Sequence, residues 1–231
     1  MWLFNSSIGR KVVMSVTGLA LVLFLLFHMS MNLVAIFSAD AYNMICAFLG
    51  ANWYAVVASM LLALLAVVHI IYAIILTLQN LRARGKDRYA IRVRPKGVSW
   101  ASKNMFVLGV IVVLGLGLHL FNFWYRMQFA ELVGDHSIAT ALEGVAGPHD
   151  GAGLIRYTFS QPLFVVLYVV WLLALWFHLT HGFWSALHTL GGSNKKWLPR
   201  IQVISIVVTT LIILGFAAVL VYYYAQSLLV A

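Results

Sequence analysis

Residues 12–37 read VVMSVTGLALVLFLLFHMSMNLVAIF, a stretch without a charged side chain. A helix needs about 20 predominantly apolar residues to cross the hydrocarbon core of a bilayer. The stretch is also too long for the apolar region of a secretory signal peptide, which has about 7–15 residues. It therefore predicts a transmembrane helix that stays in the mature protein.

Four further apolar stretches of similar length follow, at residues 53–81, 104–125, 162–190 and 202–226. Each is continuously apolar rather than alternating, which favours helices over the strands of a membrane barrel. Only 9% of the residues are charged, against about 25% in a soluble domain, and the 63% hydrophobic content excludes a disordered chain. We expect one domain over residues 1–231, an all-α integral membrane protein with five transmembrane helices.

The charged residues divide between two sets of loops. Thirteen of the 15 Lys and Arg residues lie before the first stretch, between the second and third, or between the fourth and fifth. Five of the six Asp and Glu residues lie in the other loops. The positive-inside rule then places the N-terminus in the cytoplasm and the C-terminus outside. This placement accounts for the net charge of +9, so we expect no binding of nucleic acid.

Two loops and one cysteine complete the outline. The outer loop at residues 126–161 ends in the glycine-rich run GVAGPHDGAG and is interpreted either as a cap or as a flexible connector. The basic loop at residues 82–103 predicts an orientation signal in contact with membrane lipid, and a docking surface is the alternative. The single cysteine, Cys46, excludes a disulfide framework and a thiolate metal cluster.

Four of the eight histidines lie well inside the first four predicted helices, one in each: His28, His69, His119 and His178. A polar ring in hydrocarbon needs partners for its nitrogens, so such a histidine is a candidate functional residue. Hydrogen bonding between helices is the simpler alternative. The other predicted span, 202–226, contains no histidine.

The four histidines fall into two layers. Counted at 1.5 Å per residue from the predicted outer helix ends, His28 lies about 14 Å deep and His119 about 10 Å deep. His69 and His178 both lie about 24 Å deep. Each layer holds two histidines from different helices, which suits two stacked haems whose irons are each held on both faces by neutral imidazoles. A proton path is the alternative.

An internal repeat supports this pairing. The pattern M-x3-G-x9-H occurs twice, at residues 14–28 and 105–119. Its glycines would let a flat macrocycle or another helix approach the backbone. In the fourth helix His181 lies one turn from His178 and competes with it as a ligand, although depth matching to His69 favours His178.

The fourth helix also carries the clearest motif. Residues 178–185 read HLTHGFWS, and this run is similar to the H-x-x-x-G-[LF]-W pattern in the cytochrome b membrane anchors of succinate:quinone oxidoreductases. Those are the succinate dehydrogenases and fumarate reductases, and the chain resembles their single-polypeptide, five-helix, two-haem type. Ser15, Gly18 and Asn32 around His28, the run HIIY at residues 69–72 and His119 fit the other ligand helices. In the family pattern His178, not His181, holds the ligand position.

The resemblance implies a larger enzyme in a bacterial cytoplasmic membrane. His69 and His178 would hold the inner of two b haems, and His28 and His119 the outer one. A flavoprotein with covalent FAD and an iron–sulfur protein would dock on the cytoplasmic side. This chain would contain no catalytic centre of its own and would exchange electrons with a quinone, menaquinone in this type. A dimer of the heterotrimer is the larger assembly that we expect.

The haem propionates need hydrogen-bond donors and a quinone needs a polar lining, and the sequence offers candidates for both. Candidate contacts for the haem propionates are Ser15, Trp100, Lys103, Arg126 and His188. Candidates for the lining of a quinone site are Asn32, Tyr42, Asn122 and Gln161. Interfacial anchoring and helix capping are the alternatives for each of them.

The sequence departs from the family at one functional position. Some members carry a Glu two residues before the fourth ligand, where this chain has Trp176, and no Asp or Glu lies inside the five predicted spans. A proton path built on a carboxylate is therefore not expected. Two other functions stay open at this point: the cytochrome b subunit of a hydrogenase or formate dehydrogenase, and a haem-free transporter with a histidine proton relay.

Overall fold

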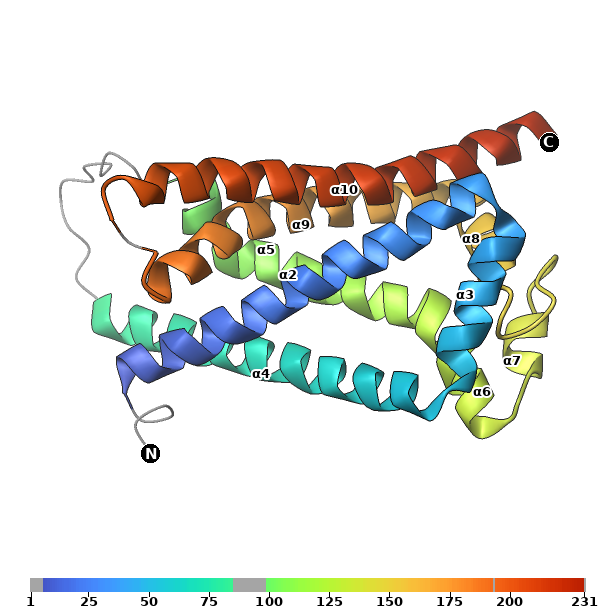
Figure 1. The fold of residues 1–231 in the computed structure, drawn as a ribbon, viewed down its shortest axis with the longest axis horizontal. Coiled ribbons are helices and arrows are strands. Elements are labelled where there is room, and N and C mark those ends of the chain that lie inside the picture. Colours follow the sequence, from blue (N-terminus) through green and yellow to red (C-terminus); the bar gives the residue numbers. More distant parts are fainter. Residues whose placement is uncertain (1–5, 85–98, 193, 231) are drawn as a thin grey trace.

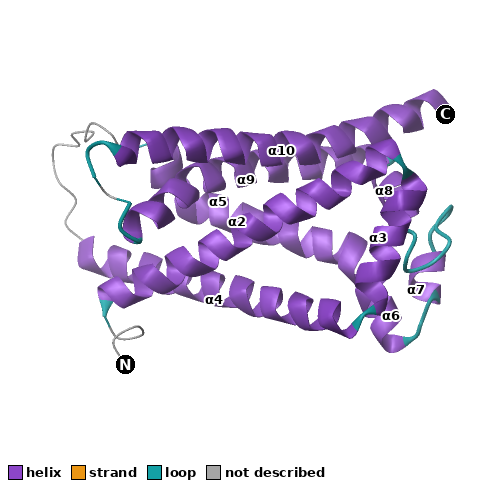
Figure 2. Ribbon diagram, in the orientation of Figure 1, coloured by secondary structure: helices purple, strands orange, loops and turns teal. Residues whose placement is uncertain are grey.

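The computed structural model describes residues 6–84, 99–192 and 194–230. Within these ranges every regular element is a helix and no strand occurs (Figure 2). Five helical segments are long and apolar enough to cross a membrane. The expected all-α fold with five spans is therefore confirmed, and these spans are those of a multi-pass membrane protein.

The five spans are built from α2 (Ser7–Phe37), α4 (Trp53–Arg84), α5 (Trp100–His119), α9 (Pro162–Thr189) and α10 (Trp197–Val230). The third span continues beyond α5 through the π-helix η1 (Leu120–Phe129) and α6 (Ala130–Val133). It therefore ends later than the predicted boundary at residue 125. The polar residues of η1, Asn122, Arg126 and Gln128, lower the hydropathy there without ending the helix.

Three short helices lie together at one end of the bundle (Figure 1). They are α3 (Ala39–Ala51), α7 (Ser137–Thr140) and α8 (Gly151–Phe159). We call this the capped end, and the opposite end, where α2 and α10 begin, the basic end. The residues of the basic loop from 85 to 98 lie outside the described residues.

The segment from 126 to 161 forms a packed cap. Its helix α8 packs on α3, α9, α10 and η1, and all but Arg156 and Tyr157 of its nine residues are buried. The Asp150 side chain caps α8 by accepting a hydrogen bond from the N–H of Gly153 at 3.0 Å. Of the two interpretations of this loop, the cap is correct and the flexible connector is wrong.

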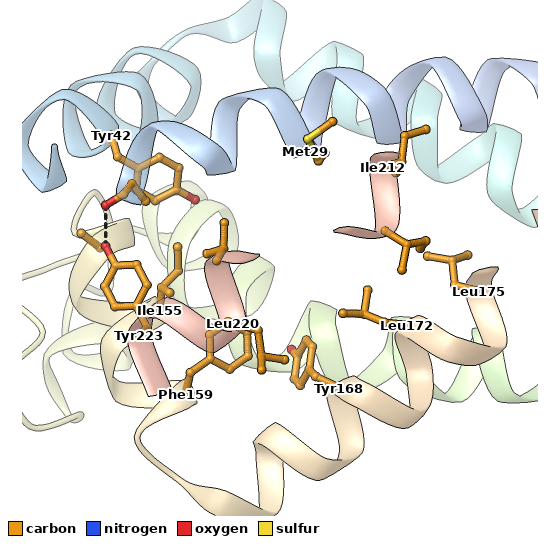
Figure 3. Packing of buried hydrophobic residues seen from close by; sticks show 14 of the residues in the cluster. Met29, Tyr42, Ile155, Phe159, Tyr168, Leu172, Leu175, Ile212, Leu220 and Tyr223 are labelled. Carbon is orange, nitrogen blue, oxygen red and sulfur yellow. Dashed lines mark hydrogen bonds between the residues drawn. The ribbon is translucent and has the colours of Figure 1, made fainter. Parts of the chain in front are cut away.

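The main hydrophobic core lies between α2, α9 and α10 and extends into the cap (Figure 3). Met29 of α2 faces this core together with Leu172 and Leu175 of α9 and Ile212 of α10. At the capped end the Tyr223 hydroxyl donates to the carbonyl of Ala35 at 3.0 Å. These contacts hold α2 against α9 and α10, whereas α4 packs on α2 and α3 at the side of the bundle.

Candidate functional site

The four histidines of the predicted helices meet in two pairs. His28 of α2 and His119 of α5 face each other with ring centroids 5.8 Å apart and an interplanar angle of 84°. His69 of α4 and His178 of α9 face each other at 6.5 Å and 66°. These are the two pairings that the depth count predicts. None of the four side chains is fully buried.

Each pair spans two helices that are not themselves closely packed. Close packing joins α2 to α4, α9 and α10, and α5 to α9. Among the described helices, α2 with α5 and α4 with α9 are not among the closely packed pairs. The paired rings therefore bridge across spaces that the packing of the bundle leaves between helices.

The ring separations fit a metal between each pair. A ring nitrogen ligates a metal at about 2.0–2.1 Å, so two imidazoles on opposite sides of one metal have centroids about 6 Å apart. Both observed separations are close to this value. No group of three or more His, Cys, Asp or Glu side chains suited to a metal ion occurs in the described ranges. A pair of histidines suits a haem, because the macrocycle supplies the other ligands of the iron.

The glycines of the internal repeat lie against the second pair. A Cβ atom at Gly18 would meet Cε1 of His69 at 3.2 Å, and one at Gly109 would meet Cε1 of His178 at 3.8 Å. Each repeat therefore supplies a histidine to one layer and a glycine to the other. Glycine and histidine are ten positions apart in each repeat, which is about 15 Å along a helix. The repeat sets the distance between the layers.

Thr17 fixes the tautomer of His69. Its hydroxyl lies 3.1 Å from Nδ1 of His69, 2.9 Å from the carbonyl of Val13 and 3.1 Å from that of Met14. If the hydroxyl donates to one of these two carbonyls of its own helix, its oxygen accepts from Nδ1–H of His69. Nε2 of His69 therefore keeps its lone pair, which is the arrangement of a metal-ligating histidine.

The geometry also distinguishes the two histidines that compete in α9. His178 faces His69, whereas the ring of His181 packs edge-on against Trp184 at 5.1 Å. Nδ1 of both His178 and His181 is buried without a hydrogen-bond partner among the described residues. The unsatisfied nitrogen is common to both residues and does not distinguish them. The position of the His178 ring opposite His69 therefore favours His178 as the partner of His69.

Aromatic side chains surround the first pair. Phe24 stacks on His28 at 5.2 Å, and Phe216 of α10 lies 5.7 Å from the same ring. Trp171 lies 5.6 Å from His119, and its Nε1 donates to the carbonyl of Val112 at 3.0 Å. The sequence analysis did not single out these rings or Thr17. Thr17 stands one residue before the repeated glycine Gly18, and this position was the sequence feature that could have indicated its role.

The residues proposed for the propionates are spread over the bundle. Ser15 is buried in α2, whereas Trp100, Lys103 and His188 are exposed near the basic end. The Trp100 ring lies 5.1 Å from that of Phe177. Arg126 donates to the carbonyl of Ile138 at 3.2 Å and lies over the ring of Phe121. Arg126 thus holds the cap.

The four residues proposed for a quinone site occupy three places. The Tyr42 hydroxyl donates to Oδ1 of Asn32 at 3.1 Å, and Nδ2 of Asn32 lies 3.5 Å from both ring nitrogens of His28. Asn122 is buried in η1 and donates to the Tyr168 hydroxyl at 3.4 Å. Gln161 lies apart from these, in a cleft beside α8 and α10. Asn32 and Tyr42 are the two that the structure brings together.

Trp176 occupies the position where some members of the resembled family carry a carboxylate. Its Nε1 donates to Oγ1 of Thr210 in α10 at 3.0 Å. The residue therefore joins α9 to α10, which is a packing role.

The cap contains a hydrogen-bonded lock around Asp150. The carboxylate accepts from the N–H of Ala146 at 3.0 Å and from Nδ2 of Asn43 at 2.8 Å. Burial by itself would raise the pKa of Asp150, but these donors, the N–H of Gly153 and the positive charge of Arg156 together outweigh it and hold the pKa below its ordinary value. Asn43 in turn accepts from the N–H of Ala152 at 2.9 Å, so the lock fastens α8 to α3.

A second polar cluster lies on the cap surface. Oε2 of Glu131 is 3.4 Å from Nε2 of His136 and 3.4 Å from Nε2 of His149. These two histidines are partly exposed and share one carboxylate oxygen.

Comparison of the chain with protein-family models, curated proteins and solved structures gives no match.

Proposed function

We propose that this chain is the cytochrome b membrane-anchor subunit of a succinate:quinone oxidoreductase. The single observation that carries the proposal is the meeting of four intramembrane histidines in two facing pairs, His28 with His119 and His69 with His178. The motif HLTHGFWS at residues 178–185 and the order of the four histidines support the choice of family.

In this proposal the two histidines of each pair would hold one b haem. Bound haem supplies one-electron transfer, and the chain supplies ligation, orientation and a dry setting. Thr17 holds the proton on Nδ1 of His69, so that Nε2 is free to ligate. Asn32 accepts from the Tyr42 hydroxyl and donates to the backbone carbonyl of His28 at 2.8 Å, so it joins Tyr42 to the turn of α2 that carries His28.

The direction across the membrane follows from the charge distribution. We propose a bacterial cytoplasmic membrane with the basic end in the cytoplasm, where the iron–sulfur subunit and the FAD-bearing flavoprotein would dock. Menaquinone is the proposed electron partner in the membrane. Within the five spans that the structure describes, the one Asp or Glu is Glu131, in the last turn of the third span at the capped end. We therefore propose that no carboxylate path for compensating protons runs through the bundle. Each electron would then exchange about 2.3 kcal/mol with a membrane potential of 100 mV.

The test is a haem count by pyridine haemochrome on the purified membrane complex, with a dithionite-reduced difference spectrum. We expect two b haems per copy of this chain. His28→Ala and His119→Ala should lose one haem, and His69→Ala and His178→Ala should lose the other. His136→Ala, on the cap surface, is the matched control and should keep both.

The other outcomes decide between the remaining functions. Absence of haem from the fully assembled complex would overturn the proposal and favour a transporter with a histidine relay. Two haems together with a co-purified hydrogenase or formate dehydrogenase subunit would overturn the assignment to succinate:quinone oxidoreductases alone. Co-purification of a flavoprotein with succinate-reducible haem would support the whole proposal.

A further inference from the structure

A cleft of about 740 Å³ opens at the capped end, beside the last turns of α10. Its walls come from α8, from the turn at Glu143 and Gly144, and from the end of α10. Figure 1 shows α8 beneath the C-terminal part of α10, and the two helices are in contact. The volume is in the range of ligand-binding pockets, which is about 300–1,000 Å³.

Arg156 gives the cleft a positive charge. It is exposed, although it lies on a helix most of whose residues are buried. Arg156 makes no ion pair within 4.0 Å in the described part of the chain. Arg126, the other basic residue of this end, is held by the carbonyl of Ile138. Asp150 is close enough to feel the charge of Arg156 but does not pair with it within 4.0 Å, so the guanidinium can still contact an anion that enters the cleft.

Glu143 gives the cleft a negative charge on a separate wall. It is exposed, and the following residue, Gly144, has a φ of 73°. This left-handed conformation favours glycine and fixes the turn that carries Glu143. Arg156 and Glu143 both line the cleft but do not pair with each other within 4.0 Å. A ligand that enters the cleft therefore meets two separate charges of opposite sign.

The position of the cleft at the end of a spanning helix indicates that its ligand also has an apolar part. Leu229 lines it and is 87% exposed, and it belongs to the last turns of a helix that can span a membrane. Lipid headgroups lie at this level, where the hydrocarbon core ends. A ligand for the cleft therefore has one phosphate-like anion, one cation and an apolar tail.

We propose that the cleft binds the headgroup of a zwitterionic phospholipid with a primary amine, phosphatidylethanolamine. Arg156 binds the phosphate, Glu143 binds the ammonium group, and the acyl chains run along α10 past Leu229. Gln161 and Tyr157 complete the wall on the side of α8. The inference does not depend on the haem proposal, because no histidine of either pair takes part.

The test measures lipid retention by native mass spectrometry. The full chain, with any subunits that co-purify, is given phosphatidylethanolamine or phosphatidylglycerol with identical acyl chains. We expect the wild type to retain phosphatidylethanolamine severalfold better. Arg156→Gln should retain at least about tenfold less of either lipid than the wild type, because a charge-assisted contact with the phosphate is lost. Glu143→Gln should lose the preference and retain phosphatidylglycerol at least as well.

Lys196→Gln is the matched control, because it removes an equal charge at the exposed basic end, and it should retain lipid like the wild type. Elution profile and melting temperature of each variant separate lost binding from misfolding. Equal retention by the wild type and Arg156→Gln would overturn the proposal. Equal affinity of the wild type for the two lipids would also overturn the proposal, as would displacement of the lipid from the cleft by a quinone.

Discussion

The hydroxyl of Thr17 lies 3.1 Å from Nδ1 of His69, and its own proton is taken by a carbonyl of α2. The contact joins α2 to α4 inside the membrane-spanning part of the bundle. A hydrogen bond from Nδ1–H of His69 to this oxygen would leave Nε2 unprotonated, which is the state that the proposed haem ligation requires.

Thr17→Val should weaken haem binding at the His69–His178 pair. Valine has nearly the same shape but cannot accept the Nδ1–H proton. Loss of such a partner reduces metal affinity by about 10–100-fold. The measurement is the ratio of the two haems in the reduced spectrum, with Thr17→Ser as the control that keeps the hydroxyl. Equal haem content in all three proteins would contradict the role assigned to Thr17.

Gly115→Ala should disturb the other pair. A Cβ atom at Gly115 would overlap the ring of Trp171, which lies against His119. Overpacking of this kind costs about 1–3 kcal/mol, so we expect preferential loss of the haem held by His28 and His119. At Gly117 a Cβ atom would meet nothing within 4 Å among the described residues, so Gly117→Ala is the matched control. If the two alanine variants have the same haem spectrum, the packing argument is wrong.

His178→Ala and His181→Ala should differ in haem content. His178 faces His69, whereas His181 packs on Trp184. We therefore expect His178→Ala to lose one haem and His181→Ala to keep two, as counted by pyridine haemochrome. Loss of one haem in the His181 variant alone would reverse the assignment.

Cys46 should react slowly with alkylating reagents. Burial raises the pKa of its thiol to about 11, although contacts with Tyr42 and with the backbone at Gly151 act in the other direction. The thiolate fraction at pH 8 is then about 100-fold lower than for a free thiol. Iodoacetamide labelling followed by mass spectrometry measures the rate, and the same reaction in denaturant is the control. Equal rates in the two conditions would show that the cap does not cover Cys46.

The spans could be predicted from sequence because charge-free runs such as residues 12–37 have one stable place, the hydrocarbon core. The histidine pairing could be predicted because depth follows from residue count, and the rings of His28 and His119 are found 5.8 Å apart. Helix α3 could not be predicted by the same signal, since a helix of 13 residues is too short to span. Its only local sign was Ser38, whose side chain caps it by accepting from the N–H of Ala41.

The cap shows a different limit of sequence reasoning. A glycine-rich run is compatible with a connector, but Gly151 is required by close packing. A Cβ atom there would lie 2.5 Å from Sγ of Cys46 and 2.8 Å from Cε1 of Tyr42. These contacts join residues about a hundred positions apart, and no local pattern reports them. The π-helical turns that follow His119 likewise have no signature in the hydropathy.

Asp150→Asn should loosen the cap in a pH-dependent manner. The pKa of Asp150 is depressed in the folded protein, so its stabilisation is present above its ordinary value of 3.8 and is lost as the pH falls through the lower folded value. At pH 6 the variant should expose the backbone of residues 143–160 to hydrogen exchange more than the wild type, by about 1 kcal/mol in opening free energy. Below pH 3.8 the difference should shrink, because the opened cap then takes up a proton at Asp150 more readily than the closed cap does. Comparison of the two proteins at the same pH cancels the intrinsic pH dependence of exchange. A difference that stays constant from pH 6 to pH 3 would mean that the charge of Asp150 does not hold the cap.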